Sequence, residues 1–169
     1  MKIGLISDTH LLTGDVLDDA VRRAFAGVDL ILHAGDIYDA SVLDQLETLA
    51  PVLAAEGNGD EERGLKDPRV KPVHVIEIEG VRLGLVHGMV YPEAGHWILA
   101  REMERCFGGP VAVAVFGDTH VPLVEDCHGV LVVNPGSPTW PYNWKRTPGT
   151  VALLEVDGLG ARARLVELG

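Results

Sequence analysis

Cysteine is scarce in this sequence of 169 residues, which contains only Cys106 and Cys127. The two lie far apart and neither belongs to a CxxC pattern, so the sequence predicts neither a disulfide framework nor a zinc knuckle. Reduced thiols are the simpler interpretation. The signatures GxSxG and GxxxxGK[ST] are also absent, which leaves a serine or cysteine hydrolase without support and excludes a P-loop.

Long apolar runs and basic residues are also lacking. No apolar run reaches membrane-spanning length, and Met1 is followed by the strand-like KIGLIS instead of a cationic leader, so we expect a cytoplasmic protein. The chain has 14 basic against 25 acidic residues and a formal net charge of -11. This balance argues against binding of long nucleic acid. Part of the acidic excess can neutralise bound cations.

A short motif occurs twice in the chain. GDTH at 117–120 repeats SDTH at 7–10, and each copy closes an apolar run. In an extended chain, side chains two residues apart point to the same face, so Asp8 can converge with His10 and Asp118 with His120. A carboxylate and an imidazole placed together suit a metal ion.

The length of the chain and its lack of long polar tracts predict one domain, residues 1–169, of the α/β class. The first half alternates predicted strands at 5–7, 29–36 and 52–60 with predicted helices at 15–27 and 41–50. The third strand runs into a glycine-rich turn at GNGD, and the second helix has Ser41 as N-cap. A hairpin over 73–88 turning near Glu79 and Gly80, a helix at roughly 93–107 and a strand over 111–120 come next. The carboxyl end is mostly β, with strand pairs at 121–126 and 129–134, and at 150–156 and 161–168.

Five apolar strands of this prediction finish in polar groups. These groups are Asp8 with His10, Asp36, Asn58, His87, and Asp118 with His120. Any one of them is more often a turn former or a helix cap than a ligand. Taken together, with a glycine beside four of them, oxygen and nitrogen donors at so many strand ends predict one crevice that binds metal.

These motifs, in this order, resemble a known family. DTH (8–10), GD (35–36), GN (57–58), HG (87–88) and GDTH (117–120) look like the motif set of the calcineurin-like metallophosphoesterases. The small size and NPGS at 134–137 are similar, more narrowly, to the small YfcE-like phosphodiesterase group. The resemblance covers nearly the whole chain and implies a β-sandwich of two mixed sheets flanked by helices, an αββα arrangement of four layers.

The resemblance also implies roles for the seven donor residues. Asp8, His10 and His120 would hold one divalent ion, Asp36 would bridge two ions, and Asn58, His87 and Asp118 would hold the second. All of these except Asp118 would count as catalytic residues. Two cations about 3.5 to 4 Å apart can clamp a phosphoryl group and provide hydroxide to attack phosphorus near neutral pH. Imidazole with carboxylate suits Mn²⁺, our first expectation, or Ni²⁺, Fe²⁺ or Zn²⁺, better than Ca²⁺.

Three positions depart from the family pattern. Asp118 stands where the family usually has the first His of GHxH, which predicts a second site with harder ligands that favours Mn²⁺ over Zn²⁺. Gly59 stands where many larger relatives have a His that protonates the leaving group, so activated esters should turn over best. Met89 stands where relatives often show the second His of HGH.

The remaining histidines favour structural interpretations. His33, inside LHAGD, is expected to be a hydrogen-bonded packing residue, and His74 and His128 to be peripheral. His96 also looks peripheral, although the loop after His87 leads into its helix and makes it the one to test as a substrate contact.

The segment WPYNWKR at 140–146 allows two interpretations, a rim that stacks an aryl group and attracts phosphate, or a contact between subunits of a homodimer. We favour the subunit contact. Asn134 is expected, from the resemblance, to support the site.

The predicted function is therefore a metal-dependent phosphodiesterase or phosphatase acting on a small phosphate ester. A scaffold for protein partners is the alternative, because the small retromer subunit resembles the same fold and fold alone does not settle function. Retention of the ligand residues favours the enzyme.

Overall fold

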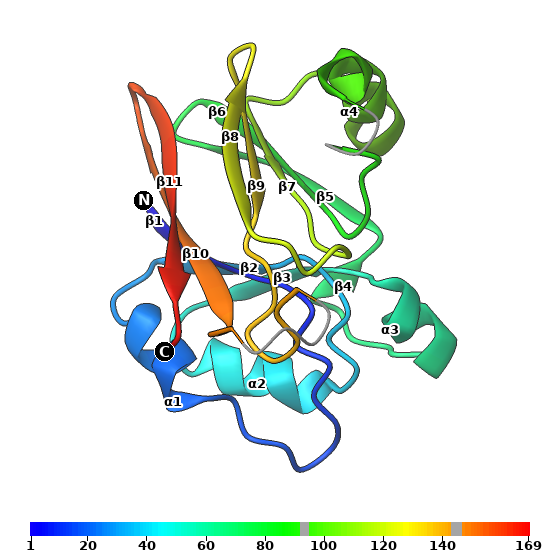
Figure 1. Cartoon of the computed structure of the whole chain (residues 1–169), viewed down its shortest axis with the longest axis vertical. Coiled ribbons are helices and arrows are strands. Elements are labelled where there is room, and N and C mark those ends of the chain that lie inside the picture. Colours follow the sequence, from blue (N-terminus) through cyan, green and yellow to red (C-terminus); the bar gives the residue numbers. More distant parts are fainter. Residues whose placement is uncertain (92–94, 143–146) are drawn as a thin grey trace.

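The computed structural model describes residues 1–91, 95–142 and 147–169 of the chain. Within these residues, two β-sheets pack face to face (Figure 1). The six-stranded sheet has the order β11 (Gly160–Glu167), β10 (Thr150–Asp157), β1 (Lys2–Ile6), β2 (Leu30–His33), β3 (Val52–Ala55), β4 (Val70–Lys71). The five-stranded sheet has the order β5 (Val73–Ile78), β6 (Val81–Val86), β7 (Val113–Val115), β9 (Val130–Asn134), β8 (Leu123–Cys127).

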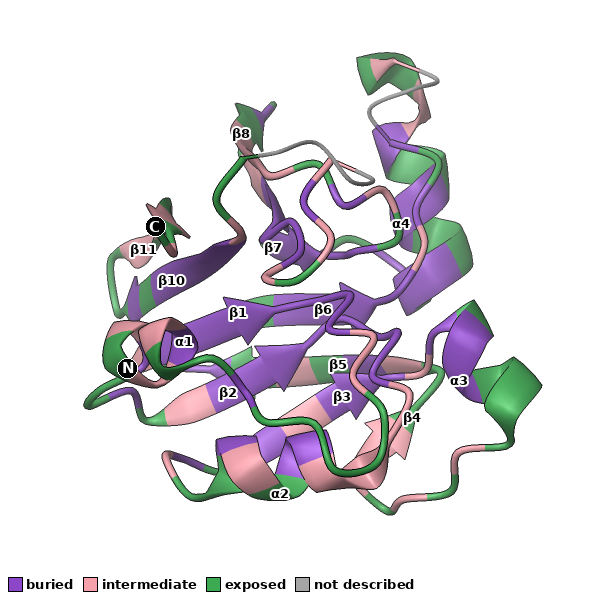
Figure 2. Cartoon of the chain, turned by 60° about the horizontal axis from the view of Figure 1, so that its bottom comes forward, coloured by how far each residue is buried: buried purple, intermediate pink, exposed green. Residues whose placement is uncertain are grey.

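Helices cover the outer faces of the sheets. Side chains of α1 (Asp19–Ala24) and α2 (Ala40–Glu47) share an apolar cluster with the six-stranded sheet, and those of α4 (Leu99–Phe107) share another with the five-stranded sheet. A third cluster fills the space between the sheets. This layering confirms the predicted α/β class and the β-sandwich of two mixed sheets flanked by helices. Figure 2 shows the result, with β1 and β10 largely buried and α2 exposed along its outer side.

Two strand glycines set the spacing between a helix layer and its sheet. A Cβ at Gly84 of β6 would lie 2.6 Å from the ring of Phe107, and one at Gly4 of β1 would lie 2.9 Å from the ring of Phe25. Each ring is buried against the strand backbone. A larger residue at either position would force the helix outward, because the interior is close-packed.

Strand direction brings the predicted site residues to one edge. Strands β1 to β4 run parallel to one another in the six-stranded sheet, and β6, β7 and β9 run parallel to one another in the five-stranded sheet. The carboxyl ends of parallel strands meet at the same edge of a sheet, where loops leave room for a site. In Figure 1 the blue segment after β1 and the orange segment after β9 lie side by side at this edge, joined by the hydrogen bond from Ser137 Oγ to Asp8 O at 2.7 Å.

Most predicted elements exist, with shorter bounds. The hairpin over 73–88 is confirmed, and it turns at Glu79 and Gly80 with φ of 50° and 80°. The N-cap of α2 is Asp39, which accepts from Ser41 N, and not Ser41 as predicted. The helix at 93–107 begins at η1, a short 3-10 helix (His96–Ile98), and continues as α4, while 92–94 lie outside the described residues.

One helix was not predicted. Asn58–Arg63 form α3 directly after β3, where the glycines of GNGD indicated only a turn. The carboxylate of Asp60 accepts from Gly57 N at 2.9 Å and so caps the first turn. In the described parts of the chain, no helix combines the length and the hydrophobicity needed to cross a bilayer.

Candidate metal centre

The loops that carry the donor residues are not extended. Asp8, His10, Asp36, Asp118 and His120 all have positive φ, between 48° and 67°. Each follows its strand instead of belonging to it, so the predicted extended geometry of both DTH motifs is wrong. Left-handed backbone costs a non-glycine residue roughly 1 to 2 kcal/mol, and five such residues in one place indicate that the fold holds these side chains in position.

Three donors form a first cluster at the ends of β1 and β7. His10 Nε2 and His120 Nε2 lie 3.1 Å apart, and His120 Nε2 lies 3.5 Å from Asp8 Oδ1. The distance from His10 Nε2 to the same carboxylate oxygen is 4.0 Å. One ligand atom from each of the three residues falls within 4.8 Å of the other two, the spacing of a metal site.

A second cluster gathers around His87, which follows β6. His87 Nε2 lies 3.1 Å from Asn58 Oδ1, 3.5 Å from Asp118 Oδ1 and 3.6 Å from Asp36 Oδ1. Asp8 also approaches this group, since ligand atoms of Asp8, Asp36 and His87 lie within 4.8 Å of one another. The side chain of Asp118 is 55% exposed, whereas Asp36 and His87 are buried, so the second cluster is open to solvent on the Asp118 side.

Asp36 lies between the two clusters. Its Oδ2 is 3.8 Å from His10 Nε2 and its Oδ1 is 3.6 Å from His87 Nε2. The structure therefore brings all seven predicted donors together, with the Asp36 carboxylate between the two clusters.

Backbone carbonyls fix the tautomers of two imidazoles. His87 Nδ1 lies 2.7 Å from Ala34 O and His120 Nδ1 lies 2.9 Å from Trp140 O, so each Nδ1 carries the proton that it donates. Each Nε2 then presents a lone pair to its cluster, as a metal ligand must. The close approach of His87 also explains Gly35, where a Cβ would lie 2.6 Å from His87 Nδ1.

Burial controls the charge of the first cluster. Burial raises the pKa of Asp8 to about 7 and lowers the pKa of His10 to about 4, and the nearby imidazoles of His120 and His87 lower the latter further. Both carboxylate oxygens of Asp8 are buried without a hydrogen-bond partner in the described structure. A buried acceptor without a partner is costly unless a cation occupies the space beside it, and the donor set therefore fits a divalent metal.

This burial predicts a pH effect on the metal-free protein. Folded Asp8 holds its proton up to about pH 7, whereas an unfolded Asp releases it near pH 4, so its contribution to stability is lost as pH rises across that interval. His10 and His33 act in the opposite direction, because their lowered pKa values give stability that is lost as pH falls below about 6.5. Comparison with Asp8→Asn isolates the Asp8 effect.

In chelator, we expect the wild type to lose stability relative to Asp8→Asn by a few kcal/mol between about pH 4 and pH 7. Urea unfolding of both proteins at intervals of one pH unit measures the difference. A constant difference over this range would contradict a buried, protonated Asp8.

His33 is confirmed as a hydrogen-bonded packing residue. It is fully buried, its Nδ1 accepts from Gly35 N at 3.1 Å, and its Nε2 therefore donates to Thr9 Oγ1 at 3.1 Å. His10 N also donates to Asp36 O at 3.0 Å. These contacts tie the loop after β1 to the loop after β2, so the donors of both loops move as one unit.

The segment after β9 supports the same loops. Asn134 Nδ2 donates to Gly117 O at 2.8 Å and to Thr119 Oγ1 at 3.1 Å, which holds the second DTH motif. Ser137 Oγ donates to Asp8 O at 2.7 Å, and Thr139 Oγ1 donates to Thr9 O at 2.8 Å. The contacts agree with the supporting position expected for Asn134, and they add the hydroxyls of Ser137, from the NPGS motif, and of Thr139, which the sequence did not single out.

Trp140 lies at the site, whereas we favoured a subunit contact for its segment over a rim beside the site. Its ring stacks on His10 with centroids 4.5 Å apart and planes at 11°, and its carbonyl accepts from His120. In WPYNWKR, residues 143–146 lie outside the described residues, so the subunit contact proposed for that segment stays a prediction. An aromatic residue three positions after NPGS is the signal that could have placed Trp140 here.

The other singled-out residues lie elsewhere. His74 is buried, with Nε2 2.8 Å from Ala54 O, so its peripheral placement was wrong, whereas His128 is exposed as expected. His96 Nδ1 contacts Tyr91 Oη and Cys127 Sγ at 3.1 and 3.2 Å instead of the donor clusters. Met89 is buried in the apolar cluster under α4.

Comparison with known proteins identifies the family. Residues 1–159 match the model of the calcineurin-like phosphoesterase superfamily domain. The chain belongs to the calcineurin-like phosphoesterase superfamily. A probable metallophosphoesterase of Methanothermobacter thermautotrophicus is 39% identical over 170 residues, which cover 100% of this chain and 94% of that protein. A phosphodiesterase of Methanocaldococcus jannaschii is 30% identical over 80% of this chain and 83% of its own length.

Several solved structures share the fold. Vps29 from Entamoeba histolytica, solved in complex with zinc, has a TM-score of 0.74 and 21% identity over 100% of both chains. An archaeal phosphodiesterase has a TM-score of 0.69 and 24% identity over 98% of this chain and 100% of that chain. At these identities the likeness shows the fold alone.

Proposed function

We propose that this chain, as a single metallophosphoesterase domain, is a divalent-metal-dependent phosphodiesterase with a dinuclear centre. The observation that carries the proposal is the buried Asp8 carboxylate, which has no hydrogen-bond partner among the residues that the structure describes and faces the imidazole nitrogens of His10 and His120. A structural role would leave this carboxylate with a partner. Membership of a phosphoesterase family supports hydrolysis of a phosphate ester as the reaction.

The proposed metal ligands follow the two clusters. Asp8, His10 and His120 hold one ion, Asn58, His87 and Asp118 hold the other, and Asp36 contacts both. When bound, the two cations supply Lewis-acid chemistry, lowering the pKa of the attacking water and offsetting charge on the phosphoryl oxygens. The chain holds the His87 and His120 imidazoles in fixed tautomers, and leaves the Asp118 side open for the substrate. Mn²⁺ is the proposed ion, because three carboxylates make the donor set hard.

An ester panel tests this function. Purified protein is treated with chelator, Mn²⁺, Ni²⁺, Mg²⁺ or Zn²⁺ is added back, and mono- and diesters with activated and unactivated leaving groups are assayed. We expect metal-dependent turnover that is fastest with activated diesters, because Gly59 offers no side chain to protonate the leaving group. Absence of turnover with every ester and every metal would reject the enzyme.

The second ion is predicted to depend on Asp118. In Asp118→Ala, the affinity for the second ion should fall by more than ~10-fold, while the first ion is retained. A fall of ~10-fold is the lower end of the effect of losing a residue that only contacts a metal ligand. Calorimetric titration with Mn²⁺ gives both affinities. Glu104→Ala, which removes an exposed carboxylate from α4, is the charge-matched control. Two unchanged binding events in Asp118→Ala would show that Asp118 is not a ligand.

A protein-binding scaffold is the second candidate. The Vps29 structures with the same fold favour it, although their likeness to this chain is a likeness of fold. The ester panel separates the two, since a scaffold needs no turnover. For the enzyme we propose a small phosphate ester as substrate and a cytoplasmic location, with long nucleic acid disfavoured by the charge of -11. Association as a homodimer also stays a proposal.

A further inference from the structure

Tyr38 occupies the space beside the metal centre that a side chain at position 59 would need. A Cβ built on Gly59 would collide with the ring of Tyr38 and would lie 3.1 Å from Asp36 Oδ1. The same ring stands edge-on to the His10 imidazole, with centroids 4.6 Å apart and planes at 86°. Tyr38 therefore forms the wall of the centre next to Asn58, and Gly59 is small because this ring is present.

The backbone of Tyr38 is held in a conformation that needs support. Its φ is 79°, which is costly for a residue with an aromatic side chain. Asp60 supplies the support, because its Oδ1 accepts from both Ile37 N and Tyr38 N at 2.8 Å. Asp60 is fully buried in α3, so α3 and the Tyr38 turn form one rigid unit.

Arg63 is attached to this unit at the far end of α3. Its guanidinium carbon lies 4.1 Å from the centroid of the Tyr38 ring, a cation–π contact. The Tyr38 ring therefore contacts both Arg63 and His10.

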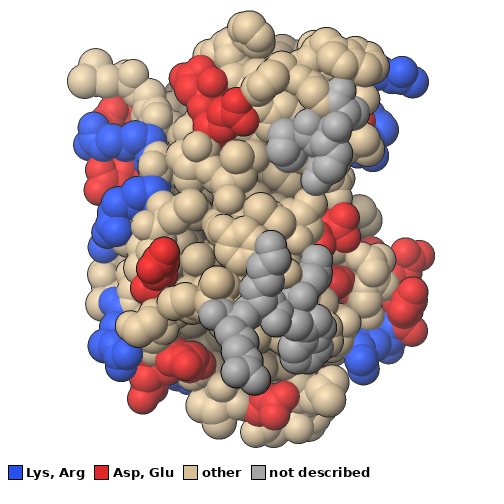
Figure 3. All heavy atoms as spheres, viewed as in Figure 1, with Lys and Arg blue, Asp and Glu red and all other residues tan. Residues whose placement is uncertain are grey.

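Within the described parts of the chain, no carboxylate forms an ion pair with Arg63. Among the described residues, the arginines that form ion pairs are Arg22, Arg69, Arg105 and Arg162. Figure 3 shows basic side chains mainly at the margins of the face in view, with one group of them beside acidic side chains over α3. An unpaired guanidinium held beside an acidic, metal-binding centre is suited to an anion that arrives with the substrate.

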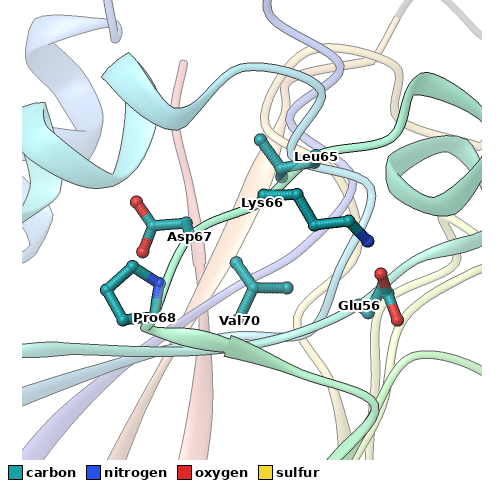
Figure 4. Close-up of a pocket in the computed structure, with 6 residues that line it drawn as sticks. All are labelled: Glu56, Leu65, Lys66, Asp67, Pro68 and Val70. Atoms are coloured by element: carbon teal, nitrogen blue, oxygen red, sulfur yellow. The ribbon is translucent and has the colours of Figure 1, made fainter.

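The next basic residue along the chain is directed elsewhere. Lys66 lines a separate hollow of about 420 Å³ between the end of β3 and the segment after α3, together with Glu56, Leu65, Asp67, Pro68 and Val70. Figure 4 shows the Lys66 ammonium pointing toward the carboxylate of Glu56. None of the seven donors lines this hollow, so Lys66 is a natural control for Arg63.

We propose that Arg63, held in place by stacking on Tyr38, binds a phosphoryl oxygen of the ester at the metal centre. This inference rests on the proposed function. Arg63 then determines affinity for the phosphate group, and Tyr38 orients Arg63 as a positioning residue. The guanidinium suits the task because it presents several donors in one plane to a phosphate, whereas the stack limits its rotation.

The test compares Arg63→Ala with Lys66→Ala in the full-length, Mn²⁺-loaded protein. For bis(p-nitrophenyl) phosphate, Arg63→Ala should raise KM by about 10- to 100-fold, the effect of losing a hydrogen bond to a charged group, with a smaller change in kcat. Inorganic phosphate should bind more weakly to the same variant by a similar factor in calorimetry. Mn²⁺ affinity should not change, and Lys66→Ala should match the wild type in every measurement.

The Tyr38 variants test positioning. Tyr38→Phe keeps the ring and should retain phosphate affinity, while Tyr38→Ala should weaken it as Arg63→Ala does. An unchanged KM and phosphate affinity in Arg63→Ala would overturn the inference while leaving the phosphodiesterase intact. If the wild type turned over no ester, the function would fail, and phosphate calorimetry alone would decide whether Arg63 binds the anion.

Discussion

Replacing Asp36 by asparagine is expected to reduce metal-dependent phosphodiester hydrolysis by at least about 10³-fold, equivalent to ~4 kcal/mol of transition-state stabilisation. Asp36 is the carboxylate that lies between the two clusters, 3.8 Å from His10 Nε2 and 3.6 Å from His87 Nε2. Without its charge, two cations at one centre would repel each other with less compensation, so the second ion should be lost first. The asparagine oxygen can still accept from Gly59 N, which donates to Asp36 Oδ1 at 2.9 Å.

The loss should come from metal binding and not from misfolding. Asp39→Asn is the matched control, because it removes the same charge three residues away and asparagine still caps a helix as well as aspartate does at the start of α2. Calorimetry with Mn²⁺ and assays with bis(p-nitrophenyl) phosphate are run on both variants, with thermal unfolding in chelator as the folding check. Full turnover with two bound ions in Asp36→Asn would remove the bridging role.

The sequence predicted which residues meet in the site better than it predicted the backbone conformation of those residues. Apolar strands ending in Asp36 and His87 indicated correctly that donors from separate strands meet. The two strands, β2 and β6, belong to different sheets, and the hydrogen bond from His87 Nδ1 to Ala34 O joins their carboxyl ends. The extended geometry assigned to Asp8 and His10 was wrong, because both take a left-handed backbone that only the surrounding loops can impose. Backbone propensity is a property of one residue type. The φ angles of Asp8 and His10 are set instead by contacts between loops, such as the hydrogen bond from His10 N to Asp36 O.

The same distinction explains what the sequence missed in the fold. GNGD contains two glycines and reads as a turn, yet Asp60 makes it the start of α3 by accepting from Gly57 N, Ile37 N and Tyr38 N. His74 sits on β5 and is buried because β3 packs over it and supplies the carbonyl of Ala54. These contacts join segments about 20 residues apart, so no local window of sequence contains them.

Trp140 is a site residue whose contact with His10 joins two segments that lie far apart in the sequence. In the described structure His10 Nδ1 is buried without a hydrogen-bond partner, whereas His87 and His120 each donate from Nδ1 to a carbonyl. The ring of Trp140, stacked on His10 at 4.5 Å, takes over the task of orienting that imidazole. Its backbone orients His120 as well, so this residue supports both imidazoles of the first cluster.

Trp140→Ala should therefore weaken the first ion by about 10- to 100-fold, the usual cost of losing an outer contact to a metal ligand, and should leave the second ion unchanged. The carbonyl that holds His120 remains in this variant, so the effect measures the stack on His10 alone. Trp140→Phe keeps an aromatic face and should recover most of the affinity, and Trp97→Ala, at a position 79% exposed, is the control for loss of a tryptophan. Calorimetric titration with Mn²⁺ resolves the two ions.

Equal first-ion affinity in Trp140→Ala and the wild type would mean that backbone geometry alone orients His10. A loss of affinity that Trp140→Phe does not recover would point to general loosening of the segment after β9.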